Sequence, residues 1–494
     1  MIHRLGPSLS IAGLRIFLLA TLFPLLSTFT AKADVLISAT LITEYDQAYF
    51  QSLGFNAATN GVQVLKLTYN TVGIDGMPTI ATAAYVDPIT TCATPLVCYF
   101  HGTVYQKDLA PSNWQDTSGV GFVGYYFGST GMACVFPDFL GLGDSSGPHP
   151  YLHASTEASA SIDAVRAARE YRMQQGNPLH EQLFLFGASA GSHACLATAQ
   201  VMQTSFPDEF NITAAGNVSG PYALYPVFRD QLISMQPYGA GANLLYALFS
   251  YSVMYPGLFP TPSSFLVPPF SFILPNLFDG THDVSQINSF VPPVTSLAIP
   301  SDLLTSITTD PNAPLNLALQ ENNVFNWQPH FPMRLYYCGS DESVPPENTF
   351  IAHDTFVANG ASDVSEIEVS ATVDHIGCGE LARPLIVEWF QALKVICDVS
   401  VAVPEKEGPS FSIAPNPANL GSVTLSLGQL PESGFGAAVR ITSLGGALVY
   451  AGPVVPNGQG HLVLSTRSWP SGFYVVEVQN QLYSIRQKLL IVDQ

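Results

Sequence analysis

The stretch that decides the fold is "LFLFGASAGSHA", residues 183–194. An apolar run predicts a buried strand leading into it, and a proline-free segment predicts a helix leading out. Between them lies the pattern G-x-S-x-G, in which Gly187 and Gly191 leave room for a sharp turn. A serine at such a turn projects above the carboxyl end of a sheet, with a helix N-terminus behind it that stabilises negative charge. The stretch therefore predicts that Ser189 is a nucleophile.

The same pattern occurs a second time, in "GDSSG" around Ser145. Pro148 and Pro150 follow directly, so no helix is expected to start there and none would face the serine with its N-terminus. The match is similar to the serine region of trypsin-like proteases. Those enzymes consist of all-β barrels and carry an upstream histidine motif, whereas this chain alternates strands and helices. We therefore interpret Ser145 as a loop residue.

Strands and helices alternate on both sides of the Ser189 turn. Such alternation implies a mostly parallel sheet covered by helices on both faces. The first of the predicted helices has Ser155 as its N-cap and Gly176 at its end. The predicted strands lie within residues 62–87 (a pair) and over 95–102, 131–139, 181–186, 333–339 and 365–373, and the helices over 155–176, 192–203, 346–360 and 379–394.

The segment 221–332 interrupts this alternation and is rich in Pro, Phe, Leu and Tyr. Its many prolines argue against a membrane span. An irregular loop is the simpler alternative, but structureless loops beyond about 15 residues are uncommon inside compact domains. We predict a packed, mostly helical cap inserted into the α/β unit.

A nucleophilic serine needs a base, and the base needs an orienting acid. His375 follows the last predicted strand of the α/β unit, and Asp341 follows the strand before it. Both are expected in loops at the sheet edge that carries Ser189. Asp374 and Glu342 are rival acids, but Asp374 adjoins the histidine and would have to bend back on its own backbone. The sequence therefore predicts a Ser189–His375–Asp341 triad.

Acyl transfer also needs donors for the developing oxyanion. Ala190, which directly follows the nucleophile, offers its backbone N–H. In "YFHGTV" (99–104), Gly102 lets the backbone approach closely, and Thr103 offers a second N–H and its hydroxyl. His101 is expected to shape this loop and not to act as the base.

Four segments, "HGT", "GASAG", "GSDESVP" and "DHIGCG", resemble the α/β-hydrolase superfamily in that order, across about residues 60–397. The stretch "PDFLGLGDSSGPHPYL" resembles the secretory-lipase-like esterases within it. The resemblance implies an α/β-hydrolase fold, Ser189 as nucleophile, Asp341 as acid and His375 as base. It also implies Ala190 and Thr103 as oxyanion donors, and an esterase or lipase that uses an acyl-enzyme and no cofactor.

Two other functions remain open at this stage. A serine peptidase shares the same fold and apparatus, and a catalytically silent binding protein is the alternative from another class. An intact Ser, Asp, His and oxyanion set argues against the silent protein. The apolar cap predicts an apolar acyl pocket, so esters of butyrate or longer acids should be hydrolysed faster than acetates.

The first 33 residues resemble a signal peptide: Arg4 and Arg15 precede an apolar run, and "AKA" ends at Ala33. A transmembrane anchor is the alternative, but Pro24 interrupts the run, which is shorter than the roughly 20 residues of a span. The net charge of −20 argues against nucleic acid and anionic membranes as partners.

Seven cysteines, an odd number, leave at least one free thiol in an exported protein. Cys98, Cys134 and Cys338 lie inside apolar runs and are expected to be small buried hydrophobes. No CxxC pair or His/Cys cluster has the spacing of a metal site, so no structural zinc is predicted.

Short alternating strands beyond residue 410 predict a small all-β sandwich. The segments "APNPANLGSVTL", "WPSGFYVVEV" and "RQKLLIVD" resemble the C-terminal sorting domain of type IX secretion substrates. A carbohydrate-binding module is the alternative. The resemblance implies the secretion machinery as partner, and export across the outer membrane of a Gram-negative bacterium. The expected organisation is a signal peptide (1–33), a hydrolase core in two parts (34–220 and 333–402) around the cap (221–332), a linker (403–410) and the sandwich (411–494).

Overall fold

The computed structural model describes residues 34–116, 119–261, 263–395, 411–419, 421–427, 438–443, 447–453, 461–479 and 484–492. The chain divides into two compact units, Met1–Cys397 and Asp398–Gln494. The predicted signal peptide (1–33) and linker (403–410) lie outside the described residues.

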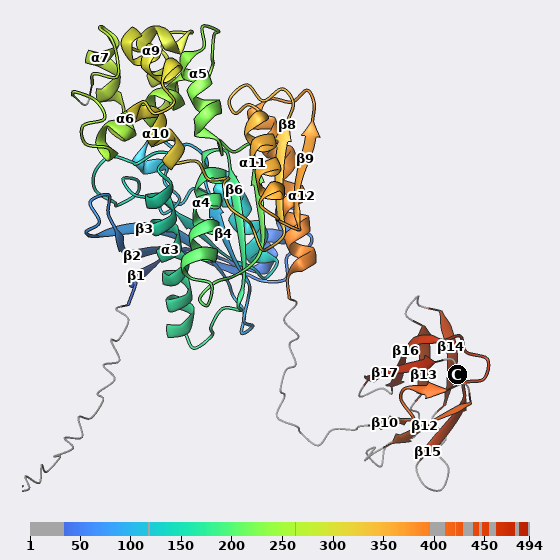
Figure 1. The fold of residues 1–494 in the computed structure, drawn as a ribbon. Helices are drawn as coiled ribbons and strands as arrows, with labels where there is room; N and C mark the ends of the chain where they lie inside the picture. Colours follow the sequence, from blue (N-terminus) through green and yellow to red (C-terminus); the bar gives the residue numbers. More distant parts are fainter. Residues whose placement is uncertain are drawn as a thin grey trace, which may run out of the picture. The chain divides into compact units, whose positions relative to one another are not determined.

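One large sheet organises the first unit (Figure 1). Its strand order is β1-β2-β3-β5-β4-β6-β7-β8-β9. The pairs β1–β2, β2–β3 and β3–β5 are antiparallel, and every pair from β5 to β9 is parallel. The carboxyl ends of the parallel strands therefore meet at one edge. The bounds are β1 Leu36–Tyr45, β2 Val62–Val72, β3 Pro78–Pro88, β4 Leu96–Phe100, β5 Ala133–Pro137, β6 Gln182–Ala188, β7 Asn211–Val218, β8 Met333–Cys338 and β9 Val364–Ser370.

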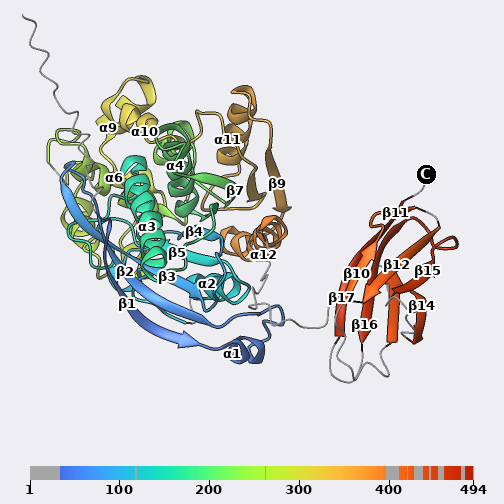
Figure 2. The ribbon, with the colours of Figure 1, turned by 90° about the horizontal axis from the view of Figure 1, so that it is seen from below.

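Helices cover both faces of this sheet, as predicted (Figure 2). Helices α3, α4 and α11 pack on one face, and α2 and α12 on the other. The alternating side chains of the strands thus enter two separate cores, which is why β4 and β5 are buried along their whole length. The bounds are α1 Gln47–Ser52, α2 Gly119–Ser129, α3 Ala154–Gln174, α4 Ala190–Ser205, α11 Glu347–Ala358 and α12 His375–Leu393.

Helix α3 begins differently from the prediction. Its N-cap is His153, not Ser155, and the His153 side chain makes no capping bond. Instead, the side-chain oxygen of Asn322, from the segment before β8, accepts the Ala154 N–H at 2.9 Å. A distant residue therefore satisfies the exposed end of the helix, so no local serine cap is needed.

The segment between β7 and β8 is helical, as predicted. Its helices form an apolar cluster of their own, to which Tyr151 and Ala190 also belong, so the cap packs onto the edge of the sheet that carries the Ser189 turn (Figure 1). The bounds are η2 Leu224–Phe228, α5 Arg229–Ile233, α6 Gly241–Met254, α7 Phe270–Ile273, η3 Leu274–Leu277, α8 Val284–Asn288, η4 Thr295–Ala298, α9 Ser301–Thr309 and α10 Pro314–Glu321.

The second unit is all-β, as predicted, with two sheets of strand order β10-β12-β15 and β11-β17-β16-β13-β14. Alternate residues of these strands, such as Val423, Ile441, Val476 and Leu489, are buried in its core. Among the described residues of either unit, none of the helices has the length and apolarity that crossing a membrane requires. The bounds are β10 Phe411–Ala414, β11 Ala418–Asn419, β12 Ser422–Leu427, β13 Ala438–Ser443, β14 Leu448–Pro453, β15 His461–Ser465, β16 Gly472–Gln479 and β17 Ser484–Val492.

Candidate active site

Ser189 lies at the sharp turn between β6 and α4. Its φ of 54° and ψ of −128° place it in a conformation that residues with a side chain rarely adopt. Both flanking glycines are required by the close packing of the turn. A Cβ at Gly191 would lie 2.0 Å from the Phe100 carbonyl oxygen, and one at Gly187 would lie 2.5 Å from the Ser192 Cα. The turn therefore holds the Ser189 hydroxyl at the carboxyl end of β6.

His375 is the first residue of α12, so the structure corrects the expectation that it lies in a loop. Its Nε2 lies 2.9 Å from Ser189 Oγ. Its backbone N–H donates to Glu342 Oε2 at 3.0 Å, and the preceding Asp374 caps the helix by accepting the Gly377 N–H at 2.9 Å. The two rival acids thus fix the start of α12 through the backbone.

Asp341 lies in the turn after β8 and completes the chain of contacts. Both of its carboxylate oxygens lie 2.9 Å from His375 Nδ1. Its Oδ1 also accepts the N–H groups of Ser343 and Val344, at 3.0 and 2.8 Å, which fixes the carboxylate in a buried position. Because Nδ1 faces a carboxylate, it carries the proton, and Nε2 of the neutral imidazole accepts from the Ser189 hydroxyl.

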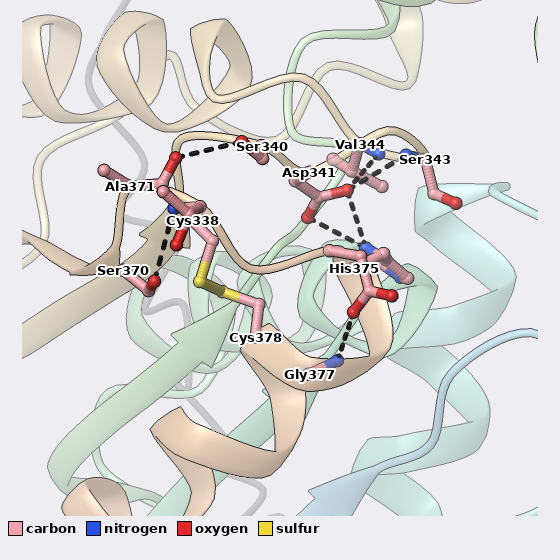
Figure 3. Close-up of a disulfide and its surroundings, with 12 residues drawn as sticks. Cys338, Ser340, Asp341, Ser343, Val344, Ser370, Ala371, His375, Gly377 and Cys378 are labelled. Atoms are coloured by element: carbon pink, nitrogen blue, oxygen red, sulfur yellow. Dashed lines mark hydrogen bonds and ion pairs between the residues drawn. A yellow bond between two sulfur atoms is a disulfide. The ribbon is translucent and has the colours of Figure 1, made fainter.

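A disulfide that the sequence did not predict joins the segments of Asp341 and His375 (Figure 3). Cys338, the last residue of β8, is bonded to Cys378 in the first turn of α12. The expectation that Cys338 is an unbonded buried thiol was wrong, because α12 packs its first turn against the end of β8. Cys98 and Cys134 are buried and free, as expected. Cys338 lies three positions before Asp341 and Cys378 three positions after His375, and this spacing was the available signal.

The loop after β4 lies against Ser189. A Cβ at Gly102 would contact Ser189 Cβ and the Ala188 carbonyl oxygen at 3.4 Å, so the backbone passes next to the serine. Thr103 follows, and its hydroxyl is bonded to the hydroxyl of Tyr151 at 2.7 Å. Ala190 is the first residue of α4, so its N–H lies outside the helical hydrogen-bond pattern. These backbone groups surround Ser189 from two sides.

The remaining two candidates, His101 and Ser145, make no hydrogen bond to Ser189, His375 or Asp341. His101 is buried, its Nδ1 donates to the Gly102 carbonyl at 2.7 Å, and burial lowers its pKa. Ser145 is buried in the segment 138–153, where the structure describes every residue and finds no helix. Its backbone carbonyl accepts from Lys107 Nζ at 3.2 Å. The described residues contain no cluster of three or more His, Cys, Asp or Glu side chains suited to a metal ion.

A narrow cavity of about 30 Å³ lies beside Ser189 and Ala190. Its other walls come from the segment after β5, from the turn after β8 and from the cap. Tyr151 and Leu152 form one side, and Phe228, Tyr238 and Leu244 of the cap close it.

Comparisons with known proteins place both units. The rice cell wall degrading esterase LipA from Xanthomonas oryzae superposes with a TM-score of 0.66 and 25% identity, over 73% of this chain and 98% of the esterase. Candida antarctica lipase A superposes with a TM-score of 0.52 to 0.54 and 17% identity, over 74% of this chain and 84% of the lipase, a likeness of fold alone. No curated protein matches the chain by sequence.

The second unit matches a family model. Residues 412–492 fit the model described as a secretion system C-terminal sorting domain. Such a tail marks proteins that the type IX secretion system exports to the cell surface or beyond. The chain thus combines a hydrolase unit of the α/β-hydrolase fold with a C-terminal sorting domain for export.

Proposed function

We propose that this protein is a secreted serine hydrolase that cleaves carboxylic esters through Ser189, His375 and Asp341. The observation that carries the proposal is the unbroken chain of contacts from Ser189 Oγ through both ring nitrogens of His375 to the Asp341 carboxylate, each at 2.9 Å. The strained turn at Ser189 and the likeness to an esterase at 25% identity support it.

In the first half-reaction, His375 Nε2 takes the Ser189 proton while Oγ attacks the ester carbonyl carbon. The carbonyl oxygen becomes an oxyanion, for which the N–H groups of Ala190 and Thr103 are the proposed donors. Buried Asp341 holds the neutral imidazole in the tautomer that leaves Nε2 free to accept the proton, and it stabilises the imidazolium that then forms. The imidazolium then protonates the leaving alkoxide, so an alcohol departs and the acyl group stays on Ser189.

In the second half-reaction, His375 Nε2 removes a proton from water, and the resulting hydroxide attacks the acyl-enzyme. The same donors hold the second oxyanion, and the proton on Nε2 returns to Ser189 as the carboxylic acid leaves. The chain's own residues supply every proton transfer, so we propose no cofactor for this reaction.

The cavity volume bears on the acyl group. About 30 Å³ is room for two or three water-sized groups, because one water needs about 10 to 15 Å³. Apolar side chains of the cap, such as Phe228 and Leu244, line this cavity. We propose that the acyl chain lies against them, so that esters of butyrate or longer acids are hydrolysed faster than acetates. Faster turnover of acetate than of butyrate would contradict it.

One assay tests the function and its rivals. The full chain should hydrolyse p-nitrophenyl esters and leave peptide anilides intact. Ser189→Ala should abolish this activity, because triad members act as a unit and their loss costs several orders of magnitude. A fluorophosphonate probe should label Ser189, and Ser145→Ala is the matched control that should retain labelling and activity. Cleavage of anilides would favour a peptidase, and no turnover with no labelling would favour a silent binding protein.

The organisation of the chain is part of the proposal. We propose hydrolase segments over residues 34–220 and 333–402, the cap over 221–332 and the sorting tail over 411–494. The signal peptide (1–33) and the linker (403–410) contribute no residue to catalysis. The position of the triad supports this division, since its last residue, His375, and the whole of helix α12 precede residue 412, where the match to the sorting domain begins. The type IX machinery is the proposed partner of the tail.

A further inference from the structure

The loop that carries Thr103 is not held by regular secondary structure of its own. It follows β4 and contains no strand or helix between residues 101 and 106, all of which the structure describes. The backbone at Gly102 touches Ser189, so a small shift of this loop would move the Thr103 donors relative to the reacting carbonyl. Electrostatic stabilisation of an oxyanion depends on donors that are already in place before the reaction. Something outside the loop must therefore fix Thr103.

Tyr151 is the side chain that contacts Thr103. Their hydroxyl oxygens lie 2.7 Å apart, and Tyr151 lines the cavity beside Ser189. The tyrosine is itself rigid, because only 4% of it is exposed and its ring stacks on Tyr246 of α6 with centroids 4.8 Å apart. A two-torsion side chain packed in this way loses little further entropy when it holds a partner.

The cap fixes the same loop at a second point. Tyr105, two residues after Thr103, donates from its hydroxyl to Asn243 of α6. Its ring also stacks on Tyr246, with centroids 4.9 Å apart. Tyr246 therefore contacts both Tyr151 and Tyr105, so one cap helix supports the loop through two tyrosines.

We propose that Tyr151 is a positioning residue for ester hydrolysis: its hydroxyl donates a hydrogen bond to Thr103 Oγ1 and so directs the threonine's own hydroxyl proton toward the oxyanion. This inference rests on the proposed function. It gives Tyr151 a role that neither the sequence motifs nor the contacts of the triad assign to it.

The direction of donation follows from the chemistry of the charged intermediate. As negative charge develops on the carbonyl oxygen, the Thr103 proton gains most by turning toward that oxygen. Thr103 Oγ1 then has free lone pairs, and the Tyr151 hydroxyl is the donor next to it. Hydrogen bonds arranged in such a chain strengthen one another in a low-dielectric site. Burial raises the pKa of Tyr151, so its proton is retained across the pH range of hydrolysis.

The experiment is a double-mutant cycle in the full chain with p-nitrophenyl acetate. Removal of a direct oxyanion donor lowers kcat by about 10²- to 10³-fold, so removal of the group that positions one should lower it by about 10- to 30-fold. We expect this loss in Tyr151→Phe with KM changed less than about threefold, because the interaction strengthens only in the transition state. Thr103→Val should lose at least as much, and adding Tyr151→Phe to it should cost no more than about a further twofold.

Two variants separate positioning from general packing. Thr103→Ser keeps the hydroxyl and should restore most of the rate that Thr103→Val loses. Tyr69→Phe is the control, because it removes a buried hydroxyl that does not line the cavity and that donates to the Ala160 carbonyl oxygen at 3.0 Å. This variant should keep kcat within about twofold of wild type. The affinity for 1-butaneboronic acid, whose tetrahedral adduct carries an oxygen in the oxyanion position, should fall in Tyr151→Phe by the same factor as kcat. This readout stands even where a Thr103 variant does not fold.

The outcomes separate the positioning role from the proposed function. If Ser189→Ala is inactive while Tyr151→Phe keeps wild-type kcat, the positioning role is wrong and the proposed function stands. A rise in KM at constant kcat, or independent losses in the double variant, also overturns the positioning role. If Ser189→Ala remains active and the fluorophosphonate leaves Ser189 unlabelled, the proposed function fails and the role of Tyr151 fails with it.

Discussion

The disulfide between Cys338 and Cys378 should contribute several kilocalories per mole to the stability of the hydrolase unit. Its sequence separation is 40 residues. A loop of that length, closed in the unfolded chain, corresponds to about 4 kcal/mol in the chain-entropy model. For a unit of this size, that loss corresponds to a melting temperature lower by about 5 °C, because the unfolding entropy scales with the number of residues. Cys338→Ala/Cys378→Ala should therefore melt about 5 °C below wild type, beyond the cost of losing two buried sulfur atoms.

The packing cost can be measured separately. Cys134 is free and fully buried in the same α/β unit, so Cys134→Ala gives the cost of deleting one buried sulfur without opening a cross-link. Residual esterase activity after heating reports on the hydrolase unit alone, since the triad lies entirely within it. Twice the Cys134→Ala shift, subtracted from that of the double variant, gives the contribution of the cross-link. A remainder near zero would refute the loop-closure argument.

The same bond should affect catalysis, because it ties the end of β8 to the first turn of α12 (Figure 3). Asp341 and His375 each lie three residues from a bonded cysteine. Without the bond, the two segments still pack together, so at 25 °C we expect kcat to fall by less than tenfold. The loss should grow on warming, well before the unit unfolds. An identical temperature profile in the double variant would show that the bond does not restrain the triad.

Three further predictions concern the site and its surroundings. Asp341→Asn should lower kcat by about 10⁴-fold at unchanged KM in steady-state ester hydrolysis, because the amide selects the wrong tautomer of the histidine. Gly191→Ala should give inactive or insoluble protein, since its Cβ would overlap the Phe100 carbonyl, and a soluble, active variant would contradict the close packing of the turn over residues 187–191. Burial lowers the pKa of His149 to about 3, below its usual 6.5, so the unfolded chain takes up a proton at this histidine before the folded chain does. The folded state therefore keeps its full stability above about pH 6.5 and loses stability as the pH falls toward 3. In His149→Asn, the amide can still donate to the Leu140 carbonyl. Between pH 7 and pH 4.5, the free energy of unfolding measured in urea should therefore fall by about 2 to 3 kcal/mol less in this variant than in the wild type.

Two of the elements that the sequence did not predict, α2 and β7, have weak local signals and strong tertiary ones. Helix α2, "GVGFVGYYFGS", contains four glycines and has a poor intrinsic helix propensity. Two of these glycines let the helix lie close to the sheet: a Cβ at Gly124 would come within 2.9 Å of Val86 in β3, and one at Gly128 within 2.7 Å of Val62 in β2. Strand β7, "NITAAGNV", has few β-branched residues and is fixed by pairing on both edges. Contacts with the rest of the sheet stabilise both elements, and a window of sequence does not contain those contacts.

The candidate site divides in the same way. The meeting of Ser189, Asp341 and His375 was predictable, because each follows a strand in a parallel sheet and such strands end at one edge. The sequence contains them in the order Ser, Asp, His, and the sheet brings the three side chains together. Tyr151 was not predictable, because its role depends on a bond to Thr103 and on a ring stack with Tyr246, which is 95 positions further along the chain. Pairing between side chains of different segments is a property of the packed molecule.

Export and the disulfide lead to one last prediction. Disulfides persist in oxidising compartments and are rare in the cytosol, and the C-terminal tail marks this chain for export. The two observations are independent and agree. Deleting residues 411–494 removes the tail and leaves every triad residue and both bonded cysteines in place. In the native host, the shortened chain should therefore accumulate inside the cell envelope as active enzyme with the Cys338–Cys378 bond formed, detectable by activity after lysis and by thiol labelling. Activity in the culture medium at the full-length level would refute the sorting role of the tail, and an inactive, aggregated product would show that the hydrolase unit depends on it.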